Sequence, residues 1–159
     1  MNVTRREALA GGSALAAMLI GGGSAAFAAA GKPAMTLHRS AGCGCCLKWA
    51  ELAKAQGYPV EIRNVQDIML VKARLGVPDA LAACHTTEVG GYVVEGHVPF
   101  EAVAKLLRDK PKGVAGIAVP GMPAGSPGMA MGHEHEHGDH AKIDVFAFTR
   151  TGVKRPFTF

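Results

Sequence analysis

The stretch "MTLHRSAGCGCCLKWAELAKAQGYPVEIRNV" at residues 35–65 predicts a strand, a helix and a second strand. Residues 35–39 alternate between apolar and polar, as a half-buried strand does, and lead into a loop of glycine and cysteine. The helix ends at Gly57 and has a proline-free apolar stripe, which consists of Leu47, Trp49, Leu52 and Ala53. The second strand lies in "YPVEIRNV" at 58–65. A unit of this kind predicts parallel strands joined by a right-handed crossover.

The following residues predict two more helices on either side of a β-hairpin. Residues 68–75 predict a helix, and 76–84 predict a turn that can hold a further short helix. "HTTEVGGYVVEG" at 85–96 has two β-prone runs around a pair of glycines, which is a hairpin pattern. The segment 98–111 predicts a helix with Pro99 in its first turn and an apolar stripe along one face.

The chain then changes character. Residues 113–142 are rich in Gly, Pro, Met and His and show neither a helical nor a strand period. Loops of such length are uncommon in compact domains unless they have a function, and we expect a Met- and His-rich loop at 118–141. Residues 143–159 predict two strands around a Thr151-Gly152 turn. The order of elements predicts an α/β protein whose thioredoxin-like, metal-binding domain at 34–159 includes the long loop and an added C-terminal β-hairpin.

The first thirty residues have the pattern of an export signal. Arg5 and Arg6 precede an apolar run at 8–20, and A-x-A-like sites follow at 26–30. The arginine pair indicates a twin-arginine signal peptide at 1–30. A membrane anchor is the alternative, but the glycine-interrupted run is shorter than the roughly 20 residues that a span requires. We therefore expect an exported protein without stable membrane insertion after processing.

The charge balance excludes some partners. The chain of 159 residues has a formal net charge of +4, and its basic residues form no run interleaved with aromatic side chains. Nucleic acid is therefore not an expected partner. No G-x-S-x-G and no phosphate-binding glycine loop is present either, so acyl transfer and phosphate chemistry have no visible site.

Three cysteines lie at the predicted start of the first helix. Cys43 and Cys46 have C-x-x-C spacing, and Cys45 lies between them. Free backbone N–H groups and the positive end of the helix dipole favour thiolates there, and thiolates are both nucleophiles and soft-metal ligands. Disulfide exchange needs only two thiols, whereas a metal site gains from the third. In a thioredoxin-like fold Cys84, just before the hairpin, would approach these three sulfurs from across the loop.

Copper fits this set of ligands best. Thiolates and thioethers select Cu(I), zinc or iron–sulfur clusters. Zinc fits less well, because its structural sites often use two separated C-x-x-C pairs and this chain has one. The long loop adds possible auxiliary ligands for Cu(I) and for Cu(II) or other divalent ions, which are Met122, Met129, Met131, His133, His135, His137 and His140.

Other interpretations remain open at this stage. Four cysteines in an exported protein can form two disulfides. A thiol-disulfide oxidoreductase would use Cys43 and Cys46, and a zinc-stabilised structural domain would have no redox role. His38 and His85 flank the cysteine segments and are candidates either for metal ligands or for groups that orient the ligands, whereas His97 is expected to be structural.

Three blocks of the sequence resemble a known family. "GCGCCLKW" at 42–49, "CHTTEVGGYVVEGHVP" at 84–99 and "GIAVPGMPAGSPGM" at 116–129 resemble, in order and spacing, a bacterial periplasmic family of predicted metal-binding proteins with a C-x-C-C motif, the CopG-like copper-resistance proteins. The family was formerly of unknown function. "HEHEHGDH" at 133–140 departs from the less histidine-rich segment expected there, so no role is transferred to it.

The resemblance implies a thioredoxin-like periplasmic protein of copper homeostasis. It implies copper binding through the cysteines that match the family's, which are Cys43, Cys45, Cys46 and Cys84. It also implies a candidate role in interconverting Cu(I) and Cu(II), although no catalytic residue is identified. The expected partners are copper ions and, as further candidates, periplasmic copper chaperones or efflux components.

Overall fold

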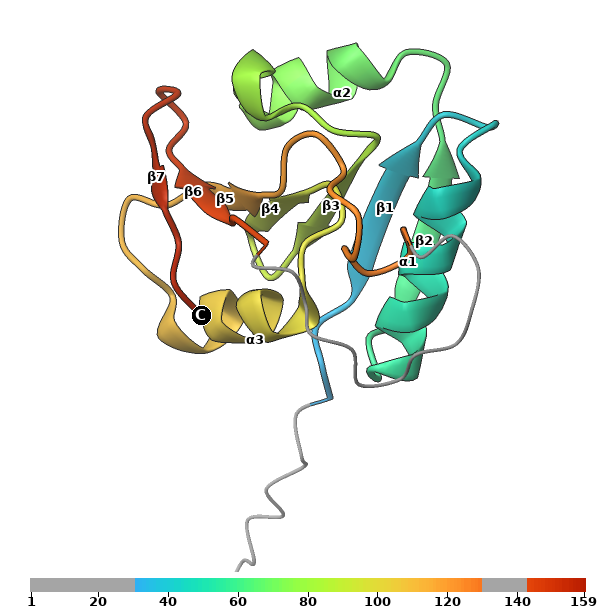
Figure 1. Ribbon diagram of the computed structural model, residues 1–159, viewed down its shortest axis with the longest axis horizontal. Coiled ribbons are helices and arrows are strands. Elements are labelled where there is room, and N and C mark those ends of the chain that lie inside the picture. The colour runs from blue at the N-terminus through green and yellow to red at the C-terminus, as the bar shows by residue number, and fades with distance from the viewer. Residues whose placement is uncertain (1–30, 130–142) are drawn as a thin grey trace, which may run out of the picture. The chain divides into compact units, whose positions relative to one another are not determined.

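The computed structural model describes residues 31–129 and 143–159, and these contain a seven-stranded mixed sheet with three α-helices. The strand order is β2-β1-β3-β4-β5-β6-β7 (Figure 1). The predicted signal peptide and the segment 130–142 of the long loop lie outside the described residues. Within them, no helix is long and apolar enough to cross a membrane. The mixed sheet and its helices confirm the predicted α/β class.

The βαβ unit has the predicted form. Strands β1 (Met35–Arg39) and β2 (Val60–Asn64) pair in parallel, with Leu37 opposite Ile62. Between them, α1 spans Gly44–Ala55, and Cys43 is its N-cap residue. The helix ends before Gly57, whose φ of 86° lies in the left-handed region that glycine adopts without strain.

The predicted hairpin consists of β3 (His85–Val89) and β4 (Tyr92–Glu95). Gly90 and Gly91 form its turn, with φ values of 55° and 83°, as a two-residue turn with two left-handed positions requires. Strand β3 also pairs antiparallel with β1, so the residue that precedes β3 lies at the same end of the sheet as the loop after β1. This pairing brings Cys84 to the start of α1.

The remaining helices also lie close to their predicted positions. Helix α2 spans Ile68–Leu75, as predicted, and the Asp67 carboxylate caps it by accepting from the backbone N–H of Met69 at 2.8 Å. A short 3₁₀ helix, η1 (Asp79–Leu81), follows in the segment where a turn that can hold a short helix was expected. Helix α3 spans Phe100–Asp109 and has Pro99 at its N-cap.

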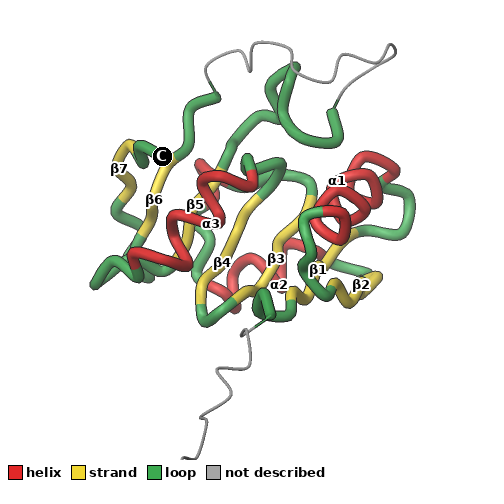
Figure 2. Tube along the Cα trace, turned by 90° about the horizontal axis from the view of Figure 1, so that it is seen from below, coloured by secondary structure: helices red, strands yellow, loops and turns green. Residues whose placement is uncertain are grey.

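Helices α1 and α3 cover one face of the sheet, and α2 lies on the other (Figure 2). The larger core lies under α1 and α3, where Trp49, Val103 and Leu106 pack against Leu37 and other fully buried strand residues. A smaller core on the opposite face contains Val77, Leu81, Val93, Ala118 and Phe148. Strands of this sheet are thus covered on both sides.

One strand was not predicted from the sequence. Residues 116–118 were expected to be irregular, but Gly116–Ala118 form β5, which pairs in parallel with β4 and antiparallel with β6 (Phe146–Phe148). All three residues of β5 are buried, so their pattern has no polar alternation to reveal a strand. Strand β7 (Lys154–Pro156) pairs antiparallel with β6 at the edge of the sheet.

Candidate metal centre

Four sulfur atoms meet where α1 begins. Cys43 occupies the N-cap position of the helix without a side-chain capping hydrogen bond, and Cys45 and Cys46 lie in its first turn. Cys84 reaches them from the segment that precedes β3, and all four Sγ atoms lie within 4.8 Å of one another. The convergence expected from the order of elements is therefore present, and closely spaced sulfurs of this kind suit a soft metal ion.

Two of these sulfurs are joined in the structure. Cys43 and Cys46 form a disulfide, whereas Cys45 and Cys84 are free. The Cys45 Sγ lies 3.5 Å from the Cys43 Sγ, and Cys46 is fully buried. The alternative of two disulfides is not what the structure shows. The disulfide must be reduced before all four sulfurs can bind a metal as thiolates.

A buried polar network fixes the segment that carries Cys84. The Glu95 carboxylate accepts from the backbone N–H of Ala83 at 2.6 Å and from the Lys72 ammonium at 2.5 Å. The Thr86 hydroxyl donates to the same carboxylate at 2.7 Å. Lys72, Thr86 and Glu95 are all nearly or fully inaccessible to solvent. The residues on both sides of Cys84 are thus tied to one carboxylate. This network was not predicted from the sequence.

Two histidines complete the surroundings of Cys84. The His97 Nε2 lies 3.1 Å from its Sγ, and the His85 Nδ1 lies 3.3 Å from it. The His97 Nδ1 is 2.7 Å from the Pro127 carbonyl oxygen. Because that oxygen can only accept, Nδ1 carries the hydrogen, and the Nε2 lone pair of the neutral ring faces the sulfur.

Burial determines the protonation of this group. Together with the neighbouring Cys45, it raises the pKa of the Cys84 thiol to about 12. Burial, together with His97, holds the pKa of His85 well below its usual value, and burial also lowers the pKa of His97. Cys84 is therefore a thiol beside two neutral imidazoles at neutral pH. A bound metal ion would replace the thiol proton.

The loop after β5 packs over the start of α1. Gly128 has a φ of 82°, and a Cβ placed on it would lie 2.9 Å from the Trp49 backbone nitrogen and 3.3 Å from the Cys45 carbonyl oxygen. Only glycine fits this contact. Trp49 in turn donates from Nε1 to the Val98 carbonyl oxygen at 3.1 Å. The loop, the helix and the segment around His97 are therefore held together.

The other predicted ligands are placed as follows. Met122 is exposed and Met129 is half-buried in this loop. Met131 and the histidines of "HEHEHGDH", which are His133, His135, His137 and His140, lie outside the described residues. His38 is buried on β1, but its Nε2 lies 2.8 Å from the Glu88 carboxylate, and it is absent from the candidate ligand groups of the described residues. Its partner is thus a carboxylate and not a cysteine.

The expectation that His97 is only structural is not what the geometry indicates. Cys84, His85 and His97 form a second group whose ligand atoms lie within 4.8 Å of one another. A lone histidine after a hairpin gives no local signal of this role. The only indication in the sequence was its place in the block "CHTTEVGGYVVEGHVP", thirteen residues after Cys84.

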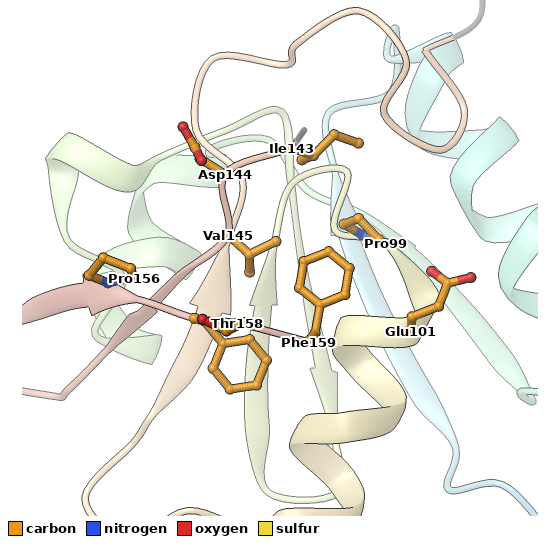
Figure 3. Close-up of a pocket in the computed structure, with 9 residues that line it drawn as sticks. Pro99, Glu101, Ile143, Asp144, Val145, Pro156, Thr158 and Phe159 are labelled. Carbon is orange, nitrogen blue, oxygen red and sulfur yellow. The ribbon is translucent and has the colours of Figure 1, made fainter. Parts of the chain in front are cut away.

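A cavity elsewhere on the surface does not contribute to this site. It lies between the first turn of α3 and the segments that flank β6 and β7 (Figure 3). Its lining consists of Pro99, Glu101, Ile143, Asp144, Val145, Pro156, Phe157, Thr158 and Phe159. It therefore has no sulfur or imidazole ligand and adds nothing to the candidate metal centre.

The comparisons with known proteins agree with this geometry. A family model described as "Protein of unknown function, DUF411" matches residues 81–129. No curated protein sequence matches the chain. The structure is similar to "Copper resistance protein copG- Form 2", with 38% identity and a TM-score of 0.69 over 80% of this chain and 97% of that one. It is also similar to "Copper resistance protein copG- Form 1", with 39% identity and a TM-score of 0.69 over 80% of this chain and 96% of that one. The chain therefore belongs to the family of the copper resistance protein CopG.

Proposed function

We propose that the protein is a periplasmic copper-binding protein of copper homeostasis or resistance, which holds Cu(I) through Cys43, Cys45, Cys46 and Cys84. The observation that carries the proposal is the convergence of all four Sγ atoms within 4.8 Å. Thiolate ligands favour soft metal ions such as Cu(I), and sulfurs this close can bridge several ions. The similarity to a copper resistance protein supports the same metal.

The Cys43–Cys46 disulfide suggests how copper redox chemistry would be coupled to the site. Reduction of a disulfide to two thiols takes two electrons and two protons. Two Cu(I) ions that are oxidised to Cu(II) release two electrons, so the two half-reactions balance when solvent supplies the protons. In the opposite direction, the dithiol would reduce two Cu(II) ions and then release two protons. The protein would thereby interconvert Cu(I) and Cu(II).

Export and the fold family belong to the same proposal. The pattern at 1–30 supports twin-arginine export to the periplasm. The parallel β1–β2 pair, with the antiparallel hairpin of β3 and β4 beside β1, is consistent with a thioredoxin-like domain to which β6 and β7 are added. Met122, Met129, Met131 and the "HEHEHGDH" histidines are proposed as auxiliary ligands that pass copper to or from the cysteines, and periplasmic copper chaperones or efflux components as its partners.

Anaerobic titration of the fully reduced protein with Cu(I) tests the copper site. We expect binding of more than one ion per chain and loss of this stoichiometry in Cys45→Ser. Lys48→Ser is the matched control, because Lys48 is exposed one turn further along the same helix. Binding of a single ion that is unaffected by Cys45→Ser would contradict the proposal.

A thiol-disulfide oxidoreductase is the second candidate, and the observed disulfide favours it. Such an enzyme needs Cys43 and Cys46 but not Cys45. Metal-free protein would then reduce insulin disulfides in the presence of a thiol reductant, with equal activity in Cys45→Ser and none in Cys46→Ser. If metal-free protein has no such activity, this candidate is eliminated.

A further inference from the structure

Cys84 belongs to two ligand groups, and the second does not involve the disulfide. On one side it faces the sulfurs of α1, and on the other it faces His85 and His97. The three ligand atoms of the second group lie within 4.8 Å of one another. This group is complete in the form of the protein that has the Cys43–Cys46 disulfide, in which two of the four sulfurs are not available as thiolates.

The distances in the second group match those around a tetrahedral metal ion. An ion bound by sulfur at about 2.3 Å and by nitrogen at about 2.0 Å holds those two ligand atoms about 3.5 Å apart. The observed separations from the Cys84 Sγ are 3.1 Å to the His97 Nε2 and 3.3 Å to the His85 Nδ1. Side-chain shifts of a few tenths of an ångström would therefore admit an ion.

His97 is also oriented as metal-binding histidines usually are. The Pro127 carbonyl accepts from the His97 Nδ1, which leaves Nε2 unprotonated and directed at Cys84. A backbone carbonyl commonly holds a metal-binding histidine in this way. His85 is fully buried, and its Nε2 has no hydrogen-bond partner within the described part of the chain. Its other nitrogen contacts only the Cys84 sulfur among the hydrogen bonds of the structure. A metal ion bound at Nδ1 would give this buried imidazole a strong polar partner on one side, with its Nε2–H still unpaired.

We propose that Cys84, His85 and His97 form a second metal site, which binds one divalent ion of borderline softness, Zn²⁺, when Cys43 and Cys46 are joined in the disulfide. One thiolate and two imidazoles are ligands that zinc prefers. Binding releases the Cys84 proton to solvent and leaves the fourth coordination position open. The disulfide form is thus a zinc-binding state of the protein, distinct from the reduced state that takes Cu(I).

The site goes beyond the proposed function and does not depend on it, because it uses neither Cys43, Cys45 nor Cys46. Cys84 is common to both sites, so one chain cannot fill both fully at once. Failure of Cu(I) binding in the reduced protein would leave this proposal intact. Failure of divalent-ion binding in the disulfide form would leave the copper proposal intact.

Co²⁺ is a suitable probe, because it takes zinc sites and its bond to a thiolate gives a charge-transfer band in the near ultraviolet. The titration uses the full chain in its disulfide form, with His133, His135, His137 and His140 changed to alanine to remove competing imidazoles. We expect one equivalent of Co²⁺ with the thiolate band and tetrahedral visible bands, displaced by Zn²⁺. Cys84→Ser should abolish the thiolate band, and His97→Gln should weaken binding at least about tenfold.

Lys48→Ser is the matched control, because Lys48 is exposed on α1 and belongs to neither ligand group, so the variant should leave the Co²⁺ spectrum unchanged. The near-ultraviolet circular dichroism of Trp49, which lies beside His85, checks that each metal-free variant is folded. Absence of Co²⁺ binding by the disulfide form overturns the proposal. So does a thiolate band that persists in Cys84→Ser.

Discussion

Buried polar side chains on the two faces of the sheet differ in how fully their hydrogen-bonding groups are satisfied. Under α2, the side chains of Lys72, Thr86 and Glu95 satisfy one another through hydrogen bonds of 2.5 to 2.9 Å. Under α1, His85 is equally buried, yet its Nε2 has no partner in the described residues and its Nδ1 faces a thiol. The first group stabilises the fold, whereas the second leaves its lone pairs available to a ligand.

The two groups meet at Cys84. Glu95 holds Ala83 and Thr86 from the α2 side, and His97 faces the intervening cysteine from the α1 side. The network of Lys72, Thr86 and Glu95 thus positions the Cys84 thiol beside the two histidines. If this distinction between structural and ligand-binding polar groups is correct, substitutions under α2 will mainly lower the unfolding free energy. Substitutions of the histidines under α1 will mainly weaken metal binding.

The largest effect on stability is expected for Glu95→Ala. It leaves the Lys72 ammonium buried without its counter-charge, which costs about 3–5 kcal/mol in unfolding free energy. Urea unfolding of the metal-free protein measures this cost. The double variant Lys72→Met/Glu95→Leu is the control and should lose much less, because no buried charge remains. A loss below about 1 kcal/mol in Glu95→Ala would show that the network is not structural.

A smaller effect is expected for Gly128→Ala in the loop over α1. The added Cβ meets the Trp49 backbone at a left-handed φ of 82°, and strain and overpacking together should cost about 2–3 kcal/mol. Gly121→Ala is a matched control, because Gly121 has a φ of 74° but no atom within 4 Å of the Cβ position. It should cost about 1 kcal/mol. Equal costs at both positions would mean that the close contact with α1 contributes nothing.

The smallest effect on stability is expected for His85→Leu. Replacement of a buried, unpartnered imidazole by an apolar side chain of similar size should change the unfolding free energy of the metal-free protein by less than about 1 kcal/mol. The same variant should lose Co²⁺ binding in the disulfide form. A destabilisation as large as that of Glu95→Ala would assign His85 a structural role and remove the difference between the two faces.

The sequence predicted the parts of this arrangement that depend on local patterns. The βαβ unit, α2, the glycine turn of the hairpin and the helix start at the cysteines all have local signals, and the order of elements brought Cys84 to the sulfurs. Strand β5 was not predicted, because its three residues are buried and show no alternation of apolar and polar side chains. Its pairing with β4 depends on the sheet and not on its own residues.

The polar partners of Cys84 could not be predicted for a different reason. Lys72 lies in a helix where a lysine is ordinarily exposed, and Glu95 lies twenty-three residues away, so only the packing of α2 on the sheet joins them. His97 follows the hairpin without any local motif, and its contact with Pro127 depends on the path of a loop with no regular period. Side-chain clusters of this kind exist only in the folded chain.

The most direct test of the account is X-ray absorption at the copper edge of the reduced full-length protein loaded anaerobically with Cu(I). The account predicts sulfur as the dominant nearest neighbour, together with a copper–copper scattering contribution from ions bridged by the cysteines. It also predicts that both features are lost in the Cys45→Ser/Cys84→Ser variant. A first shell dominated by nitrogen in the unaltered protein would contradict the central claim that the four converging sulfurs are the copper ligands.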